Sequence, residues 1–210
     1  MRSIQLFLII ILSSCSTKKE TESVQHRHTT RSENATPAIL FVIMNVKKME
    51  PMERAMKRAS AYYKQSYVVE HAPIPSNALH PKRKRYSGDS LLKYLHVYNN
   101  GRYAFAAGLT DVDICTNKNG VEDCGIFGLG SLTNNGCVTS GKRLQTGVSK
   151  QQYEDRLTKV ILHEIGHNHG VKHCVSPDPC FMKDANGKII TVDKEPVDMC
   201  QSCKQIAGIN

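Results

Sequence analysis

The amino-acid sequence predicts a mixed α/β fold, with a twisted mixed sheet and its helices placed before a small C-terminal subdomain. Short apolar runs alternate with helix-like stretches along the first part of the chain, as expected for a layered α/β domain. A longer amphipathic helix with several histidines follows. The segment after this helix is short, poor in apolar residues and rich in cysteine, so it cannot build a core of its own.

Strand and helix alternate before the histidine-rich helix. Residues 37–46 are a mostly apolar run, which is typical of a buried central strand. Residues 51–63 and 90–98 are predicted helices, and residues 67–72 and 103–109 are predicted strands. About 170 residues follow the first 36, which is enough for one domain with its own core.

The histidine-rich helix is predicted over residues 153–168. Acidic residues occupy its first turns, and its apolar residues lie close to one helical stripe. The members of this stripe are Leu157, Val160, Ile161, Leu162 and Ile165. The same helix therefore buries one side and carries histidines at its C-terminal end.

The histidines follow the spacing of a catalytic zinc site. His163 and His167 are four residues apart and lie on one face of a helix, so both imidazoles can bind one zinc ion. Glu164 lies beside them and can act as the general base for an attacking water. Gly170 can adopt the left-handed backbone that ends a helix, and His173 then returns as a third ligand. Three protein ligands leave one coordination position open, which is typical of a catalytic site.

Four cysteines follow the third histidine. A spaced pair and a Cys-x-x-Cys pair are typical of a tetrathiolate zinc site, which would order this segment. The alternative is two disulfides. Exported proteins favour disulfides, and the N-terminus described below predicts export. The four residues are Cys174, Cys180, Cys200 and Cys203.

Together these motifs resemble the archaemetzincin family of zinc metallopeptidases. The resemblance rests on His-Glu-x-x-His-x-x-Gly-x-x-His-Cys, then Cys-x-Met and, seventeen residues later, Cys-x-x-Cys. It covers about residues 109–204. It implies a metzincin-like twisted mixed sheet with helices, an active-site zinc helix and a small C-terminal subdomain with a four-cysteine zinc site.

By position, the resemblance implies two zinc ions per chain. The catalytic ion would bind the three histidines, with Glu164 as base, and the structural ion would bind the four cysteines. Met182 would be the methionine of the Met-turn, the apolar floor beneath the catalytic metal. One departure is that five residues, 175–179, separate the first two cysteines where the family has four.

Two segments near the motif have both a functional and a structural interpretation. In metzincins an exposed strand near the zinc pairs with extended substrate, and residues 125–130 resemble it; the alternative is an ordinary glycine-rich strand with a bulge. Asp111 and Asp113 lie in a Thr-Asp-x-Asp stretch that also resembles the family. They either support the sheet or contact a residue behind the metal site, or they cap the end of a strand. His169 lies at a position the motif does not use, and we expect it to have no catalytic role.

The N-terminus predicts an exported lipoprotein of the cell envelope. Residues 1–14 contain a positive charge and an apolar run too short to span a bilayer, as in a signal peptide. Residues 12–15 resemble a lipobox, which implies lipidation of Cys15 and a membrane anchor; the alternative is an ordinary secretory signal. Residues 15–36 then form the lipidated cysteine and a flexible tether, and residues 37–210 form the peptidase domain.

Three further cysteines, Cys115, Cys124 and Cys137, complete the count. One interpretation is a disulfide between Cys115 and Cys124 with Cys137 as a free thiol. The other is that all three cysteines are reduced. The chain is basic, with a formal charge of +9, and residues 81–85 are its densest basic cluster. This cluster either attracts anionic lipid or acidic substrates or is a solvated loop; nucleic acid is not an expected partner outside the cytoplasm.

The sequence therefore predicts a monomeric zinc metallopeptidase, a hydrolase acting on a peptide or protein substrate as an endopeptidase or aminopeptidase. The alternative is a membrane-anchored zinc-binding or scaffold protein without turnover. An intact Glu164 argues against that alternative, because a protein that only binds zinc does not need a base at this position.

Overall fold

The computed structural model describes residues 38–80, 84–118, 120–133 and 136–209. The predicted signal peptide, Cys15 and the tether lie outside the described residues, as do residues 81–83 of the basic cluster. All described residues belong to the unit Thr36–Asn210. Among the helices within these ranges, none is long and apolar enough to cross a membrane.

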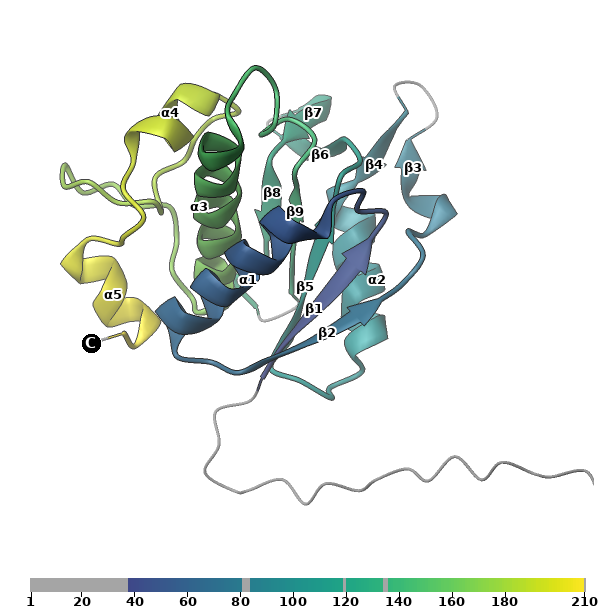
Figure 1. The fold of residues 1–210 in the computed structure, drawn as a ribbon, viewed down its shortest axis with the longest axis horizontal. Helices are drawn as coiled ribbons and strands as arrows, with labels where there is room; N and C mark the ends of the chain where they lie inside the picture. The colour runs from purple at the N-terminus through teal and green to yellow at the C-terminus, as the bar shows by residue number, and fades with distance from the viewer. Residues whose placement is uncertain (1–37, 81–83, 119, 134–135, 210) are drawn as a thin grey trace, which may run out of the picture. The chain divides into compact units, whose positions relative to one another are not determined.

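A five-stranded mixed sheet lies at the centre of the fold, with strand order β2-β1-β5-β9-β8 (Figure 1). Neighbouring strands from β2 to β9 are parallel, whereas β8 runs antiparallel to β9 at the edge. The strands are β1 (Ile39–Met44), β2 (Tyr67–His71), β5 (Phe105–Thr110), β8 (Gly128–Gly130) and β9 (Cys137–Ser140). The predicted fold class, a mixed α/β sheet with helices, is confirmed.

Alternate residues of β1 pack on opposite faces of this sheet, which explains why its sequence is apolar throughout. Ile39, Phe41 and Ile43 join the core under α1 and α3. Leu40 and Val42 join the core under α2. All six residues of the strand are buried, as expected for a central strand covered by helices on both faces.

Helices α1 and α3 pack on one face of the sheet, and α2 packs on the other (Figure 1). The helices are α1 (Met49–Tyr63), α2 (Gly88–Asn99), α3 (Lys150–Asn168), α4 (Ile189–Lys194) and α5 (Gln201–Ala207), with a 3₁₀ turn at Ser76–Ala78. Helix α3 begins three residues before the predicted start. The reason is a capping box, in which the Ser149 hydroxyl accepts from the Gln152 N–H and the Gln152 side chain accepts from the Ser149 N–H.

A second, four-stranded sheet has the order β3-β4-β6-β7. Its strands are β3 (Leu79–His80), β4 (Arg85–Ser87), β6 (Ile114–Lys118) and β7 (Val121–Ile126). The predicted single strand at residues 125–130 is wrong, because β7 ends at Ile126 and β8 begins at Gly128 in the other sheet. The chain thus crosses from one sheet to the other beside the histidine helix.

After α3 the chain forms a small C-terminal part. It contains only the short helices α4 and α5 among its described residues, and it lies along α3 (Figure 1). Its buried residues include Phe181, Met182 and Met199, which extend the core under α3. This arrangement places the residues after Cys180 directly against the histidine helix.

Candidate metal centres and active-site cleft

The three predicted histidine ligands converge. His163 and His167 lie in the last turns of α3, and His173 lies beyond the helix end. One ring nitrogen of each lies within 4.8 Å of the others. Gly170 makes this return possible, since its backbone is left-handed with φ of 81° and the Val171 N–H donates to the Gly166 carbonyl.

Hydrogen bonds orient the two helical imidazoles. Nδ1 of His163 lies 2.7 Å from the Phe181 carbonyl oxygen, and Nδ1 of His167 lies 2.7 Å from that of Val171. A carbonyl oxygen only accepts, so both Nδ1 atoms carry the proton. Removal from water lowers the pKa of His163 to about 3 and also lowers that of His167, so both rings are neutral.

The two Nε2 atoms consequently present lone pairs to each other across 3.1 Å. Two acceptors at this distance repel unless a cation or proton lies between them. A neutral imidazole whose other nitrogen donates to a carbonyl is the usual form of a metal ligand. The donor set therefore fits a zinc ion, with His173 as the third ligand.

Glu164 lies in the same cleft with 6% of its surface exposed. Burial is the largest influence on its carboxyl group and raises the pKa to about 8. Glycines of the neighbouring edge strand surround it. A Cβ added to Gly128 would lie 2.5 Å from Glu164 Oε1, and one added to Gly130 would lie 2.6 Å from the Glu164 carbonyl oxygen. Strand β8 can therefore lie against α3 only because both positions are glycine.

A cavity of about 920 Å³ contains this group of residues. Strands β6, β7 and β8 line one side of it, and α3 with residues 181–195 lines the other. The histidines and Glu164 face the same cavity. This size suits a short stretch of peptide, because ligand pockets typically measure roughly 300–1,000 Å³.

Met182 lies against α3 at Gly166, which precedes His167 in the chain. Its side chain is fully buried, and a Cβ on Gly166 would lie 2.6 Å from its sulfur. The Met182 carbonyl accepts a hydrogen bond from the Cys174 N–H at 2.9 Å. Met182 is thus an apolar side chain packed on the helix that carries His163 and His167.

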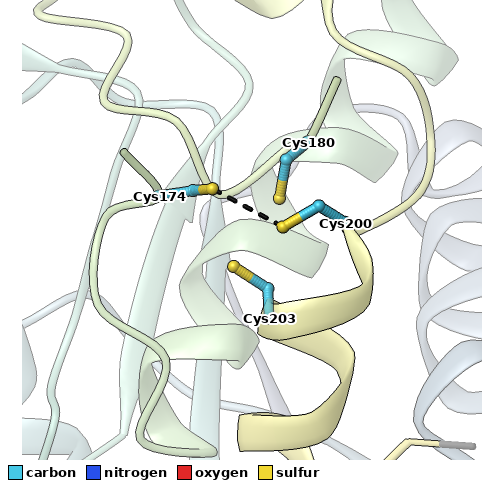
Figure 2. Close-up of side chains that lie close together, drawn as sticks. All are labelled: Cys174, Cys180, Cys200 and Cys203. Carbon is cyan, nitrogen blue, oxygen red and sulfur yellow. Dashed lines mark hydrogen bonds between the residues drawn. The ribbon is translucent and has the colours of Figure 1, made fainter. Parts of the chain in front are cut away.

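The four C-terminal cysteines also converge, as Figure 2 shows. Their sulfurs lie within 4.8 Å of one another, and all are free thiols. The Cys174 and Cys200 sulfurs are 3.6 Å apart, far beyond the roughly 2.05 Å of a disulfide. The structure thus brings the thiols together without forming either disulfide of the alternative interpretation.

The surroundings of the thiols suit a bound cation. The Ser202 hydroxyl, as the largest influence, lowers the pKa of Cys200 to about 6, whereas burial raises the pKa of Cys203. Several buried thiolates require a positive charge among them. The longer loop at residues 175–179 does not separate the four cysteines, whose sulfurs still meet, and most of its residues are exposed.

The three remaining cysteines belong to neither cluster, although Cys124 lines the cavity. Cys115, Cys124 and Cys137 are free, and the interpretation with a Cys115–Cys124 disulfide is not supported. Cys124 lies opposite Thr116 in the antiparallel pair of β6 and β7, so it shares a face with Thr116. Cys115 therefore points to the other face of that pair.

The acidic stretch and His169 have structural partners. Asp113 forms ion pairs with Arg85 and Arg143, at 2.9 and 2.6 Å. Asp111 accepts from the Lys47 N–H at 2.8 Å. His169 stacks on the Tyr63 ring with centroids 4.7 Å apart. These contacts favour the strand-end interpretation of the aspartates and place His169 outside the cleft lining.

Sequence reasoning missed two residues of the cleft. Asp184 lies against His173, and Lys118 of β6 forms an ion pair with it at 3.0 Å. The only available signal was the position of Asp184 two residues after Met182. Lys118 carried none, because it lies sixty-six positions before Asp184 in the chain.

The family model of peptidase family M54 matches residues 89–207. The chain belongs to this family. As an M54 peptidase it is a zinc metallopeptidase and therefore a hydrolase. It is 28% identical over 154 residues to the archaemetzincin of Natronomonas pharaonis, covering 70% of this chain and 84% of that protein. With the archaemetzincin of Haloquadratum walsbyi it shares 29% identity over 147 residues, covering 66% and 80%.

Solved structures support the same M54 fold. The archaemetzincin from Methanopyrus kandleri superposes with a TM-score of 0.70 at 23% identity, covering 84% of this chain and 96% of that chain. The archaemetzincin from Archaeoglobus fulgidus, complexed with malonate, gives 0.66 at 23% identity, covering 80% and 99%. The arrangement of sheet, α3 and C-terminal part is thus that of archaemetzincins.

Proposed function

We propose that this M54 peptidase hydrolyses peptide bonds with Glu164 as general base and with zinc held by the three histidines. The observation that carries the proposal is the convergence of three imidazoles and one buried carboxylate in one cleft. Zinc bound there supplies a Lewis acid that polarises the scissile carbonyl and promotes deprotonation of water. A metal-binding scaffold is not favoured, because such a protein has no use for the buried Glu164.

Glu164 must be ionised to accept a proton from the attacking water. Burial, with a smaller effect of the Asp184 charge, raises its pKa to about 8, and the positive charge of a cation at the histidines would oppose this effect. After the attack, the protonated Glu164 donates to the leaving amine, which restores the carboxylate. Because Glu164 is buried, the attraction between its carboxylate and a cation at the histidines would be stronger than in water.

The position of β8 suggests how a peptide binds. It is the outermost strand of the five-stranded sheet, and two of its residues contact Glu164 directly. An extended peptide that pairs with this edge would pass over the histidines with its backbone in a fixed register. The edge interpretation of residues 128–130 is therefore part of the proposal.

The four-cysteine cluster holds a second, structural zinc in this proposal. Cys180 and Cys200 are buried beside the core residues Phe181 and Met199, so an ion there would fix the segment that lies against α3. The chain would then bind two zinc ions. Export and lipidation at Cys15, which place the domain at a membrane surface as a monomer, complete the proposal.

The test is the substitution Glu164→Gln, which preserves size but removes the group that accepts the proton. We expect peptide hydrolysis to fall by at least ~100-fold with zinc content unchanged. His167→Ala is the matched control, since it should lower zinc content as well as rate. If Glu164→Gln hydrolyses a peptide substrate of the wild type at the wild-type rate, the assigned mechanism is wrong.

A further inference from the structure

We propose that Asp184 is the positioning residue for His173, and that Lys118 holds Asp184 in place from the opposite wall of the cleft. The inference rests on the proposed function, because it assigns His173 a ligand role. It adds two residues that the histidine motif does not contain. The three histidines differ in how firmly the structure holds them.

His163 and His167 are fixed twice. Each lies on α3, and each donates from Nδ1 to a backbone carbonyl at 2.7 Å. His173 has neither support: it lies outside the helices and strands, and its side chain is 46% exposed. An exposed imidazole on a loop loses more rotational freedom on binding a metal, so it needs a partner to hold its orientation.

Asp184 is in the position to supply that partner. Its Oδ2 atom lies 3.7 Å from Nδ1 of His173, within ion-pair range although longer than a hydrogen bond. The nitrogen that faces Asp184 is the same one that faces a carbonyl in the two helical histidines. Nε2 of His173, on the other side of the ring, is thereby left for the metal. A carboxylate behind a histidine ligand fixes its tautomer and increases its basicity.

Asp184 is itself held by contacts from two directions. Its Oδ1 atom accepts from the Asn186 N–H at 2.8 Å, within a turn where Asn186 has a φ of 47°. Its Oδ2 atom accepts from Nζ of Lys118 at 3.0 Å, and this ammonium also lies 3.4 Å from Asn186 Oδ1. Lys118 is the last residue of β6, so the pair joins the strand wall of the cleft to the C-terminal wall.

A simpler interpretation is that the pair only clamps the two walls together. That interpretation predicts that Asp184→Asn and Lys118→Met have equal effects, because each removes the clamp. The positioning role predicts unequal effects, since only Asp184 faces the histidine. Asp155→Asn is a matched control: it removes an aspartate paired with Arg58 at 2.9 Å on α3, away from the cleft lining.

The experiment uses full-length protein that has been stripped of metal and reloaded with zinc. Its zinc affinity is measured by competition with a chromophoric chelator. We expect Asp184→Asn to weaken zinc binding at the histidine site by about 10–100-fold, with the four-cysteine site unchanged. Lys118→Met should weaken it less, Asp184→Glu should restore part of it, and Asp155→Asn should leave it unchanged. In steady-state kinetics at saturating zinc, Asp184→Asn should lower kcat more than it raises KM.

Two outcomes separate this inference from the proposed function. If His163→Ala binds the same number of zinc ions as wild type, with the same affinity, the assignment of a zinc site to the histidines is wrong. If His163→Ala loses one zinc but Asp184→Asn stays within about twofold of wild type, only the positioning role is wrong. If Asp184→Asn and Lys118→Met lose zinc affinity equally and unfold at equally lowered temperatures, the pair only holds the two walls of the cleft together.

Discussion

The substitution Gly128→Ala tests whether the position of the Glu164 carboxylate governs catalysis. The added Cβ would lie 2.5 Å from Glu164 Oε1 and 2.6 Å from its Cγ, where ordinary contact begins at 3.4 Å. The carboxylate must therefore move by 3.4 minus 2.5, about 0.9 Å. Gly128 is not among the residues with positive φ, so alanine meets no backbone strain there.

A displacement of this size has a known cost in enzymes. Misplacing a reacting group by about 1 Å lowers the rate on the order of 100-fold, which corresponds to about 2.7 kcal/mol in activation free energy. The three nearest atoms to the new methyl all belong to Glu164. The histidines should therefore keep their zinc, and the loss should appear in kcat.

The assay compares hydrolysis of one peptide by wild type, Gly128→Ala and Glu164→Gln, with zinc content and thermal unfolding measured on each. Gly130→Ala is a structural comparison, because its Cβ would lie 2.6 Å from the Glu164 carbonyl oxygen and 2.9 Å from the His167 Cβ. That change must displace the strand or the helix, so it should also lower the unfolding temperature. A kcat of Gly128→Ala within about threefold of wild type would show that the position of this carboxylate does not govern the rate.

Three further predictions concern metal, acid and export. Elemental analysis of metal-loaded protein should give two zinc ions per chain, and Cys203→Ser should lower this to about one; a disulfide-linked Cys174, Cys180, Cys200 and Cys203 would contradict it. Burial alone would raise the pKa of Asp113, but Arg143 and Arg85 outweigh it and lower the pKa. Its stabilising effect is then complete above the unfolded value, near 3.8, and is lost as pH falls through the lower folded value. Asp113→Asn should cost ~1–2 kcal/mol in denaturant unfolding at pH 7 and progressively less below about pH 4, and a pH-independent difference would contradict this. Mass spectrometry of the N-terminal peptide should find acyl chains on Cys15, and unmodified wild-type protein in the soluble fraction would disprove the anchor.

Local patterns in the sequence were sufficient for the main elements and for both ligand clusters. The apolar run of β1 and the apolar stripe of α3 are buried against neighbouring elements. The spacing of apolar residues in the sequence indicates such burial directly. The histidines needed only helical spacing and a glycine turn to meet. The alternation of strand and helix therefore predicted the layers and placed the histidines at the end of a packed helix.

Features that depend on distant segments could not be predicted. The second sheet consists of strands of two to six residues whose exposed positions follow no clear alternation. The contact of Gly128 with Glu164 depends on how the edge strand lies on α3, which neither segment encodes alone. The same holds for Lys118 and Asp184, since the pairing of β6 with β7 shifts register between Thr116 and Lys118, which the local sequence does not signal.

In the C-terminal segment, single peptide bonds connect members of the four-cysteine cluster to residues that hold or form the histidine cluster. Cys174 directly follows His173, and Cys180 directly precedes Phe181, whose carbonyl orients His163. Oxidation of the thiols, or removal by a chelator of a zinc ion bound to them, would thus release the backbone that orients two of the three imidazoles. Hydrolysis would then stop without any change to the histidines themselves, so inhibition by an oxidant or a thiol-selective chelator need not mean that the reagent has reached the active-site cleft.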